Sequence, residues 1–234
     1  MEYAKINIRK ASDRGHADHG WLNSYHTFSF ADYHDPQHMG FRSLRVINDD
    51  TVKGGMGFTK HQHRDMEIIS YVIDGAMEHA DSMGNGSVIR RGHVQRISAG
   101  KGIAHSEYNH SGSDPVHFLQ IWIQPDRKGL EPSYEELPVA AEGGGLRLIG
   151  SPEGKEGGVT IHQDARLYFG RMNAGATLAH NTAAGRGIWV QVIHGDVTVA
   201  GQTLSTGDGM SIENLEEVPI GADSQTEFLL FDLH

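Results

Sequence analysis

Short runs of alternating or apolar residues, separated by turn-forming residues, cover most of this chain. Strands are predicted at 3–9, 41–47, 66–73, 88–90, 94–98, 116–123, 167–172, 188–193, 197–204, 209–212 and 228–233. A turn is expected at 48–50, and Asp74-Gly75 signals a hairpin whose return strand carries Met77 and His79. No convincing amphipathic helix interrupts these runs, so the pattern predicts an all-β protein.

For two sets of side chains the sequence predicts whether they face the solvent or the core. His79 and His93 are polar, and we expect them to point outward. Trp21, Trp122 and Trp189 are expected in the core.

The stretch 126–158 differs from the rest of the chain in composition. It is dense in loop-forming residues, among them Gly143-Gly144-Gly145, Ser151-Pro152 and Gly157-Gly158. We therefore predict a linker at 126–158 between an N-terminal domain at 1–125 and a C-terminal domain at 159–234.

Two triplets in the first half carry candidate metal ligands, His61-Gln62-His63 and His105-Ser106-Glu107. Alternate residues of a strand share a face, so His61 projects with His63, and His105 with Glu107. Three neutral imidazoles and one carboxylate suit Fe(II), Mn, Co, Ni, Cu or Zn, and a six-coordinate ion held in this way keeps two positions open. The spacing predicts one divalent metal per chain in an open, reactive site.

Neither triplet is specific by itself, because a chain with 16 histidines yields roughly one His-x-His pair by chance. The surroundings carry the argument: Gly55 precedes the first triplet, Glu67 follows it, and Gly102 precedes the second. This joint pattern is far from chance.

The two halves of the chain resemble each other. Residues 71–77 parallel 191–197, and 92–97 parallel 207–212, which suggests two stacked barrels. The same offsets carry the four ligand positions approximately to Asn181, Ala183, Ile220 and Ala222. These residue types cannot form a metal site, so we expect the metal in the first half alone.

Composition narrows the function further. The 234 residues contain no cysteine, which excludes disulfides, thiolate metal sites and cysteine nucleophiles. The net charge of −10 argues against direct nucleic-acid binding. No apolar run is long enough for a membrane span or a signal peptide. We expect a soluble, cytoplasmic monomer.

The motif Gly55-x5-His61-x-His63-x3-Glu67, with Gly102-x2-His105-x3-Asn109, resembles the two cupin motifs. The stretches 19–22, 26–33, 61–67 and 99–107 are similar to pirins, and the resemblance covers nearly the whole chain. It implies a bicupin, two antiparallel β-barrels of the jelly-roll type, with the metal in the first barrel. It favours Glu107 over Glu67 as the carboxylate ligand and leaves Glu67 to accept a hydrogen bond from a ligand imidazole.

The resemblance also implies an activity, because pirin-like bicupins are associated with the opening of a flavonol such as quercetin by O2. On this hypothesis the metal, Fe(II) or another of the ions above, binds the flavonol 3-hydroxyl while Glu107 takes its proton as catalytic base. Binding to neutral imidazoles should weaken below about pH 6.5. The alternatives are a metal- or redox-sensing interaction protein resembling the transcriptional cofactors among pirins, and another cupin metalloenzyme or binding module.

Overall fold

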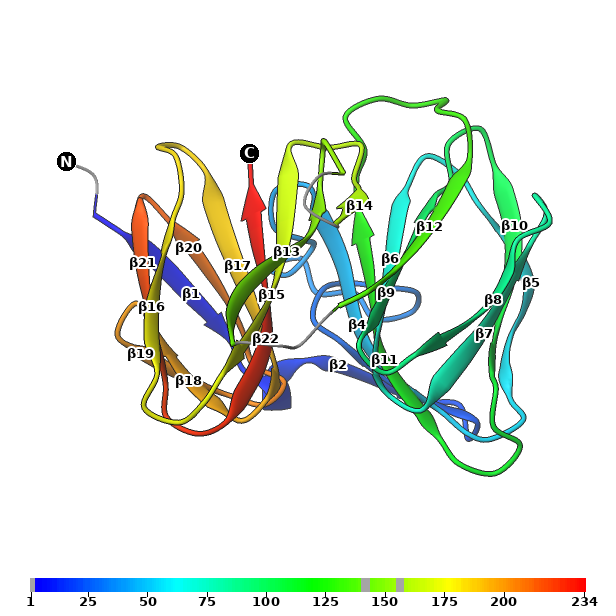
Figure 1. Cartoon of the computed structure of the whole chain (residues 1–234), viewed down its shortest axis with the longest axis horizontal. Helices are drawn as coiled ribbons and strands as arrows, with labels where there is room; N and C mark the ends of the chain where they lie inside the picture. Colours follow the sequence, from blue (N-terminus) through cyan, green and yellow to red (C-terminus); the bar gives the residue numbers. More distant parts are fainter. Residues whose placement is uncertain (1–2, 140–143, 155–157) are drawn as a thin grey trace.

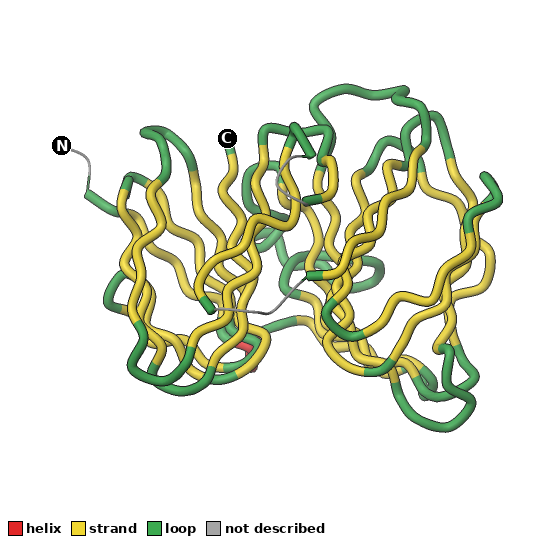
Figure 2. The backbone as a smooth tube through the Cα atoms, viewed as in Figure 1, coloured by secondary structure: helices red, strands yellow, loops and turns green. Residues whose placement is uncertain are grey.

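The computed structural model describes residues 3–139, 144–154 and 158–234. Strands are the main element of the described residues, and the one helical element among them is the short 3-10 helix η1 (Ala11–Asp13) (Figure 2). No helix in these described ranges is long and apolar enough to cross a membrane. The predicted all-β class is confirmed.

Each half of the molecule pairs a seven-stranded sheet with a four-stranded sheet, and the two halves lie side by side (Figure 1). The N-terminal barrel has the large sheet β12-β9-β6-β11-β4-β3-β2, built from β12 (Ser133–Pro138), β9 (His93–Ser98), β6 (Glu67–Asp74), β11 (Val116–Ile123), β4 (Leu44–Val52), β3 (Leu22–His26) and β2 (Gly15–Asp18). Its small sheet β5-β10-β7-β8 consists of β5 (Gly57–His63), β10 (Ile103–Asn109), β7 (Ala76–Asp81) and β8 (Gly86–Arg90).

The C-terminal barrel repeats this plan. Its large sheet β1-β20-β17-β22-β15-β13-β14 contains β1 (Lys5–Arg9), β20 (Gly209–Glu213), β17 (Gly187–His194), β22 (Thr226–Leu233), β15 (Ala165–Met172), β13 (Gly145–Ser151) and β14 (Val159–Thr160). Its small sheet is β16 (Thr177–Asn181), β21 (Glu217–Ala222), β18 (Asp196–Val199) and β19 (Gln202–Ser205). Neighbouring strands are antiparallel except β13 and β14, which are parallel. The protein is therefore a double barrel, as the internal repeat predicts.

Each large sheet has β1 or β12 as one of its two edge strands. β1, at the start of the chain, pairs with β20 in the C-terminal sheet, whereas β12 pairs with β9 in the N-terminal sheet. The predicted edge strand at 3–9 is confirmed, but it completes the second barrel rather than the first.

The loop expected throughout 126–158 is wrong for the described part of that segment, because β12 and β13 lie within it. Both are short and mostly half-buried, so they lack the continuous apolar run that marks a central strand. Residues 140–143 and 155–157, with Gly143 and Gly157 of the predicted loop motifs, lie outside the described residues. The division at 1–125, 126–158 and 159–234 stays a prediction.

Two further local predictions are corrected by the structure. Residues 48–50 continue β4 instead of forming a turn, because Asn48 and Asp50 are buried and hydrogen-bonded inside the N-terminal barrel. The strand predicted at 197–204 is a hairpin, with Ala200 and Gly201 both at positive φ in its turn.

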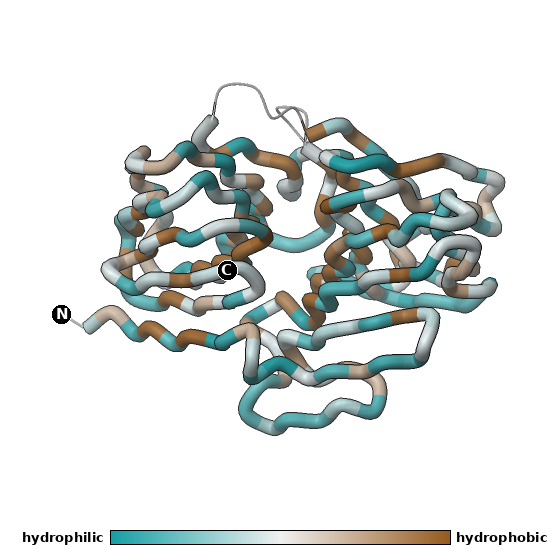
Figure 3. Tube along the Cα trace, turned by 90° about the horizontal axis from the view of Figure 1, so that it is seen from below, coloured by the Kyte–Doolittle hydropathy of each residue, from teal (hydrophilic) through white to brown (hydrophobic). Residues whose placement is uncertain are grey.

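The largest apolar cluster lies where the two large sheets face each other. It takes Ile69 and Tyr71 from the first barrel and Leu229 and Phe231 from the second, and Figure 3 shows hydrophobic stretches in this central region. Alternation along β6 turns Ile68 and Ser70 the other way, into the N-terminal barrel. The contact between the sheets thus fixes which residues face the interior of that barrel.

Candidate metal centre

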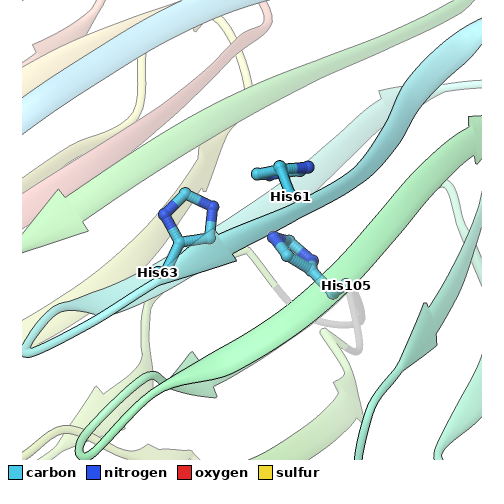
Figure 4. Close-up of side chains that lie close together, drawn as sticks. All are labelled: His61, His63 and His105. Carbon is cyan, nitrogen blue, oxygen red and sulfur yellow. The ribbon is translucent and has the colours of Figure 1, made fainter.

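Three histidines from two adjacent strands meet inside the N-terminal barrel. β5 and β10 are antiparallel, and their register places His61 directly opposite His105. The ring centroid of His105 lies 4.4 Å from that of His61 and 5.0 Å from that of His63. Their potential ligand atoms all lie within 4.8 Å of one another, and Figure 4 shows the three side chains close together.

Each of these rings has a nitrogen available to bind a metal. His61 Nδ1 lies 2.8 Å from the carbonyl oxygen of Thr59, to which it donates its proton, leaving Nε2 as an acceptor. His63 Nε2 and both ring nitrogens of His105 are buried without a hydrogen-bond partner. Such unpartnered groups are costly unless an ion or water satisfies them, so the residues present fit a bound metal.

Electrostatics keep two of the rings neutral. Burial lowers the pKa of His63 to about 4 and that of His105 to about 3, with the neighbouring imidazoles adding to the effect. Neutral imidazole is the form that binds a cation.

Glu107 is buried on the same strand as His105, in a polar setting. Its carboxylate accepts hydrogen bonds from Gln95 Nε2 at 2.8 Å, Gln120 Nε2 at 3.3 Å and Ser70 Oγ at 3.4 Å. Burial raises its pKa to about 7 despite these bonds. Glu107 is grouped with His79 and His105, within 4.8 Å, rather than with His61 and His63.

Glu67, the alternative carboxylate, lies on the other side of the sheet. β5 ends before β6 begins, so Glu67 does not share a strand face with His61. Glu67 accepts hydrogen bonds from Ser98 and His162, neither of which is a predicted ligand. Glu67 lies two residues before Ile69 on β6, so both side chains are on the face of the sheet that is turned toward the second barrel. The geometry favours Glu107.

His79 does not point outward as expected. It is 1% exposed, because it shares the inner face of β7 with buried Met77. Its ring is stacked on Tyr134, with centroids 4.8 Å apart, and its Nε2 lies 3.3 Å from Asp81 Oδ2. His93, by contrast, is half-buried and pairs with Glu136. Sequence reasoning missed His79 because a histidine between two exposed positions looks like a surface residue.

A cavity of about 470 Å³ opens onto His61 and His63. Its aromatic side includes Phe30, Phe58 and Trp122, and the rings of Phe30 and Trp122 meet edge to face at 5.4 Å. Trp122 is half-buried: it packs against the core cluster of Ile68 and Ile97, and its ring centroid lies 5.2 Å from that of His63. Trp21 is half-buried and Trp189 is buried.

The lining of this cavity also contains polar residues, which lie on the same large sheet as Trp122. Asp50 accepts a hydrogen bond from Ser24, and burial raises the pKa of Asp50 to about 7. Next to this pair, His26 Nδ1 lies 2.8 Å from Asn48 Oδ1. Residues 19–33 supply much of the lining, but the order of hydrophobic and polar residues in this stretch does not predict a cavity.

The four corresponding positions of the second barrel form no metal site. Ile220 and Ala222 belong to its buried hydrophobic cluster, while Asn181 and Ala183 are exposed. Among the described residues of this half, no three potential ligands gather within 4.8 Å. His180 instead pairs with Asp232 at 2.9 Å, and His162 bonds to Glu67 and Ser98.

Replacing His162 or His180 by alanine is expected to leave the metal content at that of the wild type. His180→Ala should lower the free energy of unfolding by about 1–3 kcal/mol, because buried Asp232 loses a hydrogen-bond partner. Elemental analysis and denaturant unfolding measure the two effects. A fall in metal content with the fold intact would contradict the assignment of the site to the first barrel.

The pH dependence of metal binding is expected to differ from that of ordinary histidine ligands. Glu107 must lose its proton to bind a cation, and with its pKa near 7 the affinity should fall about tenfold per pH unit below 7. His63 and His105 compete with protons only in stronger acid. Ni²⁺ titrations from pH 5 to 8 measure this, and Glu107→Gln should abolish the decline near 7. The same profile in both proteins would refute the role of Glu107.

Fold and site together define a double-barrel cupin with a histidine-rich centre suited to a transition metal. Residues 7–123 match the Pirin family, and 148–233 match the Quercetinase C-terminal cupin domain. The chain belongs to the pirin family. It is 49% identical over 228 residues, 97% of this chain and 98% of the relative, to quercetin 2,3-dioxygenase of Escherichia coli K12.

Two solved structures of a bacterial pirin superimpose closely on this chain. The crystal structure of YhhW from Escherichia coli is 48% identical, superimposes with a TM-score of 0.96 and covers 98% of each chain. The bacterial pirin YhhW in complex with nickel(II) gives a TM-score of 0.95 at 48% identity, covering 98% of this chain and 99% of that one. The nickel complex and the ligand groups of this chain together support one transition-metal centre.

Proposed function

We propose that this protein is a metal-dependent quercetin 2,3-dioxygenase, which uses O2 to open the central ring of a flavonol. The observation that carries the proposal is the group His61, His63 and His105 beside a cavity with an aromatic side. The name of the relative that is 49% identical supplies the substrate class. An aromatic cavity at the metal centre favours an enzyme over a metal-sensing interaction protein or a simple binding barrel.

The cavity has the size and the chemistry that a flavonol requires. About 470 Å³ is within the usual range of small-molecule sites. Phe30, Phe58 and Trp122 offer ring faces and edges to a planar aromatic, and Asp50 and Ser24 offer hydrogen bonds to its hydroxyls. A flavonol in this cavity would lie beside His61 and His63, which are part of its lining.

The proposed metal ligands are His61, His63, His105 and Glu107, and the proposed ion is Fe(II), with Mn, Co, Ni, Cu or Zn as alternatives. When bound, any of these ions would favour the deprotonated form of a substrate hydroxyl, and a redox-active ion such as Fe(II) would also supply electron transfer to O2. The donor set is mixed imidazole and carboxylate, which suits these ions rather than a softer one.

Glu107 is the proposed base. Gln95, Gln120 and Ser70 hold its carboxylate in place. It would take the proton of the flavonol 3-hydroxyl, leaving an electron-rich anion for reaction with O2. Burial excludes bulk water from this proton, since Glu107 is 1% exposed.

Asp50→Asn is expected to raise the KM for quercetin about tenfold and to change kcat less. The substitution keeps an acceptor for Ser24 but removes the carboxyl group that faces the substrate, and uniform loss of binding appears in KM. Steady-state kinetics at fixed metal content measure it, with His110→Ala, an exposed histidine, as the control. An unchanged KM would remove Asp50 from substrate binding.

The function itself is tested by stripping the metal and restoring each candidate ion before an aerobic screen. Quercetin absorbance should decline only in the metal-replete protein, and fastest with the native ion. Equal rates in the stripped and restored proteins would refute a metal-dependent activity.

A further inference from the structure

A second group of potential ligands lies in the same barrel and shares His105 with the first. It consists of His79, His105 and Glu107, whose ligand atoms all lie within 4.8 Å of one another. Each of the three is 1% exposed, whereas His61 and His63 are half-buried. The register of β7 and β10 places His79 directly opposite Glu107, so this proximity is a consequence of strand pairing.

His79 is arranged as a metal ligand. Its Nε2 lies 3.3 Å from Asp81 Oδ2, and since a carboxylate can only accept, that nitrogen carries the proton. Asp81 is itself held by the backbone N–H groups of Met83 and Asn85 and by the Asn85 side chain. This is the carboxylate–histidine arrangement that orients ligands in metal sites. It leaves the lone pair of His79 Nδ1 buried and without a hydrogen-bond partner.

His105 can serve either group. Both of its ring nitrogens are buried and unpartnered, although a ligand imidazole ordinarily donates its second N–H to an acceptor. His105 is close to His79 as well as to His61, with ring centroids 5.5 and 4.4 Å apart. One imidazole thus lies between two sets of donors.

We propose that the barrel contains a second, more deeply buried position for the metal, formed by His79, His105 and Glu107, and that a single ion occupies either position. The proposal rests on the metal centre of the proposed function. Glu107 belongs to the inner group as it stands, not to the group of His61 and His63. The two groups share His105, and a neutral imidazole has one lone pair to give to a metal, so occupancy is one at a time.

The test removes the outer position and keeps the inner one. His61→Ala/His63→Ala is expected to bind one Co²⁺ or Ni²⁺ per chain, with an affinity about 10- to 100-fold below that of the wild type. Adding His79→Phe should eliminate this ion, because phenylalanine preserves the stacking on Tyr134 and supplies no ligand atom. Elemental analysis after gel filtration gives the stoichiometry, and Co²⁺ absorption titrations give the affinity.

Two controls guard the interpretation. His79→Phe alone should still bind one ion at the outer position, which also shows that the variant folds. Adding His110→Ala to the double variant, in place of His79→Phe, should leave the ion bound, because His110 is exposed and pairs only with Glu78 in the described contacts.

The inference is overturned if the double variant is folded by circular dichroism yet metal-free while the wild type is loaded. It is equally overturned if the triple variant retains the ion, or if His79→Phe alone loses it. A metal-free double variant leaves the outer site and the dioxygenase proposal untouched, whereas loss of the ion from a folded His79→Phe protein would count against the outer site as well. A wild-type protein that takes up no metal would overturn both.

Discussion

Replacing His105 by alanine is expected to abolish metal binding and to reduce quercetin turnover by about 10³-fold or more. His105 is the one residue common to both ligand groups, so its loss removes a donor from each of them. A bound ion contributes several kcal/mol to transition-state stabilisation, and each 1.4 kcal/mol corresponds to a factor of ten in rate. Elemental analysis and quercetin absorbance under air measure the two effects.

His110→Ala is the matched control for this variant, because it removes a histidine on the surface near the end of the same sheet. It should keep full metal and full activity. His61→Ala should lose affinity and rate as well, although its half-buried position makes any packing defect smaller. A His105→Ala protein with undiminished metal would contradict the ligand assignment.

Glu107→Gln is expected to lose about 10²- to 10⁴-fold in turnover while retaining part of its metal. The amide preserves the shape of the side chain but cannot act as a base, and general-base catalysis typically contributes this much. Gln95 and Gln120 can rotate their amides to suit the new group, so the fold should persist. Single-turnover rates at equal metal loading measure the effect, and a loss of less than about fivefold would remove Glu107 from proton transfer.

The sequence predicted the central strands of this fold well, because burial on both faces gives them a continuous apolar signal. β6, β11, β17 and β22 were found for this reason. β16 and β21, whose exposed and buried residues alternate over few positions, were missed. The partner of β1 could not be predicted, because pairing with β20 depends on the packing of the whole second barrel.

The candidate site, too, could be predicted from the sequence only in part. Strand parity could pair His61 with His63 and His105 with Glu107, since that rule depends only on local geometry. His79 and Asp50 could not, because their burial follows from a polar barrel interior that no single strand reveals. The polar run at 48–50 was interpreted as a turn for the same reason: a polar residue in a strand signals solvent unless a cavity replaces it.

The most direct test of the dioxygenase proposal is the yield of carbon monoxide per quercetin consumed by metal-replete protein, under air and under nitrogen. Similar cupin dioxygenases release carbon monoxide on opening the ring, so we expect about one carbon monoxide per quercetin consumed under air. Under nitrogen we expect neither loss of quercetin nor release of carbon monoxide. His61→Ala should show little of either. Quercetin lost without carbon monoxide, or at the same rate in His61→Ala, would contradict the proposal.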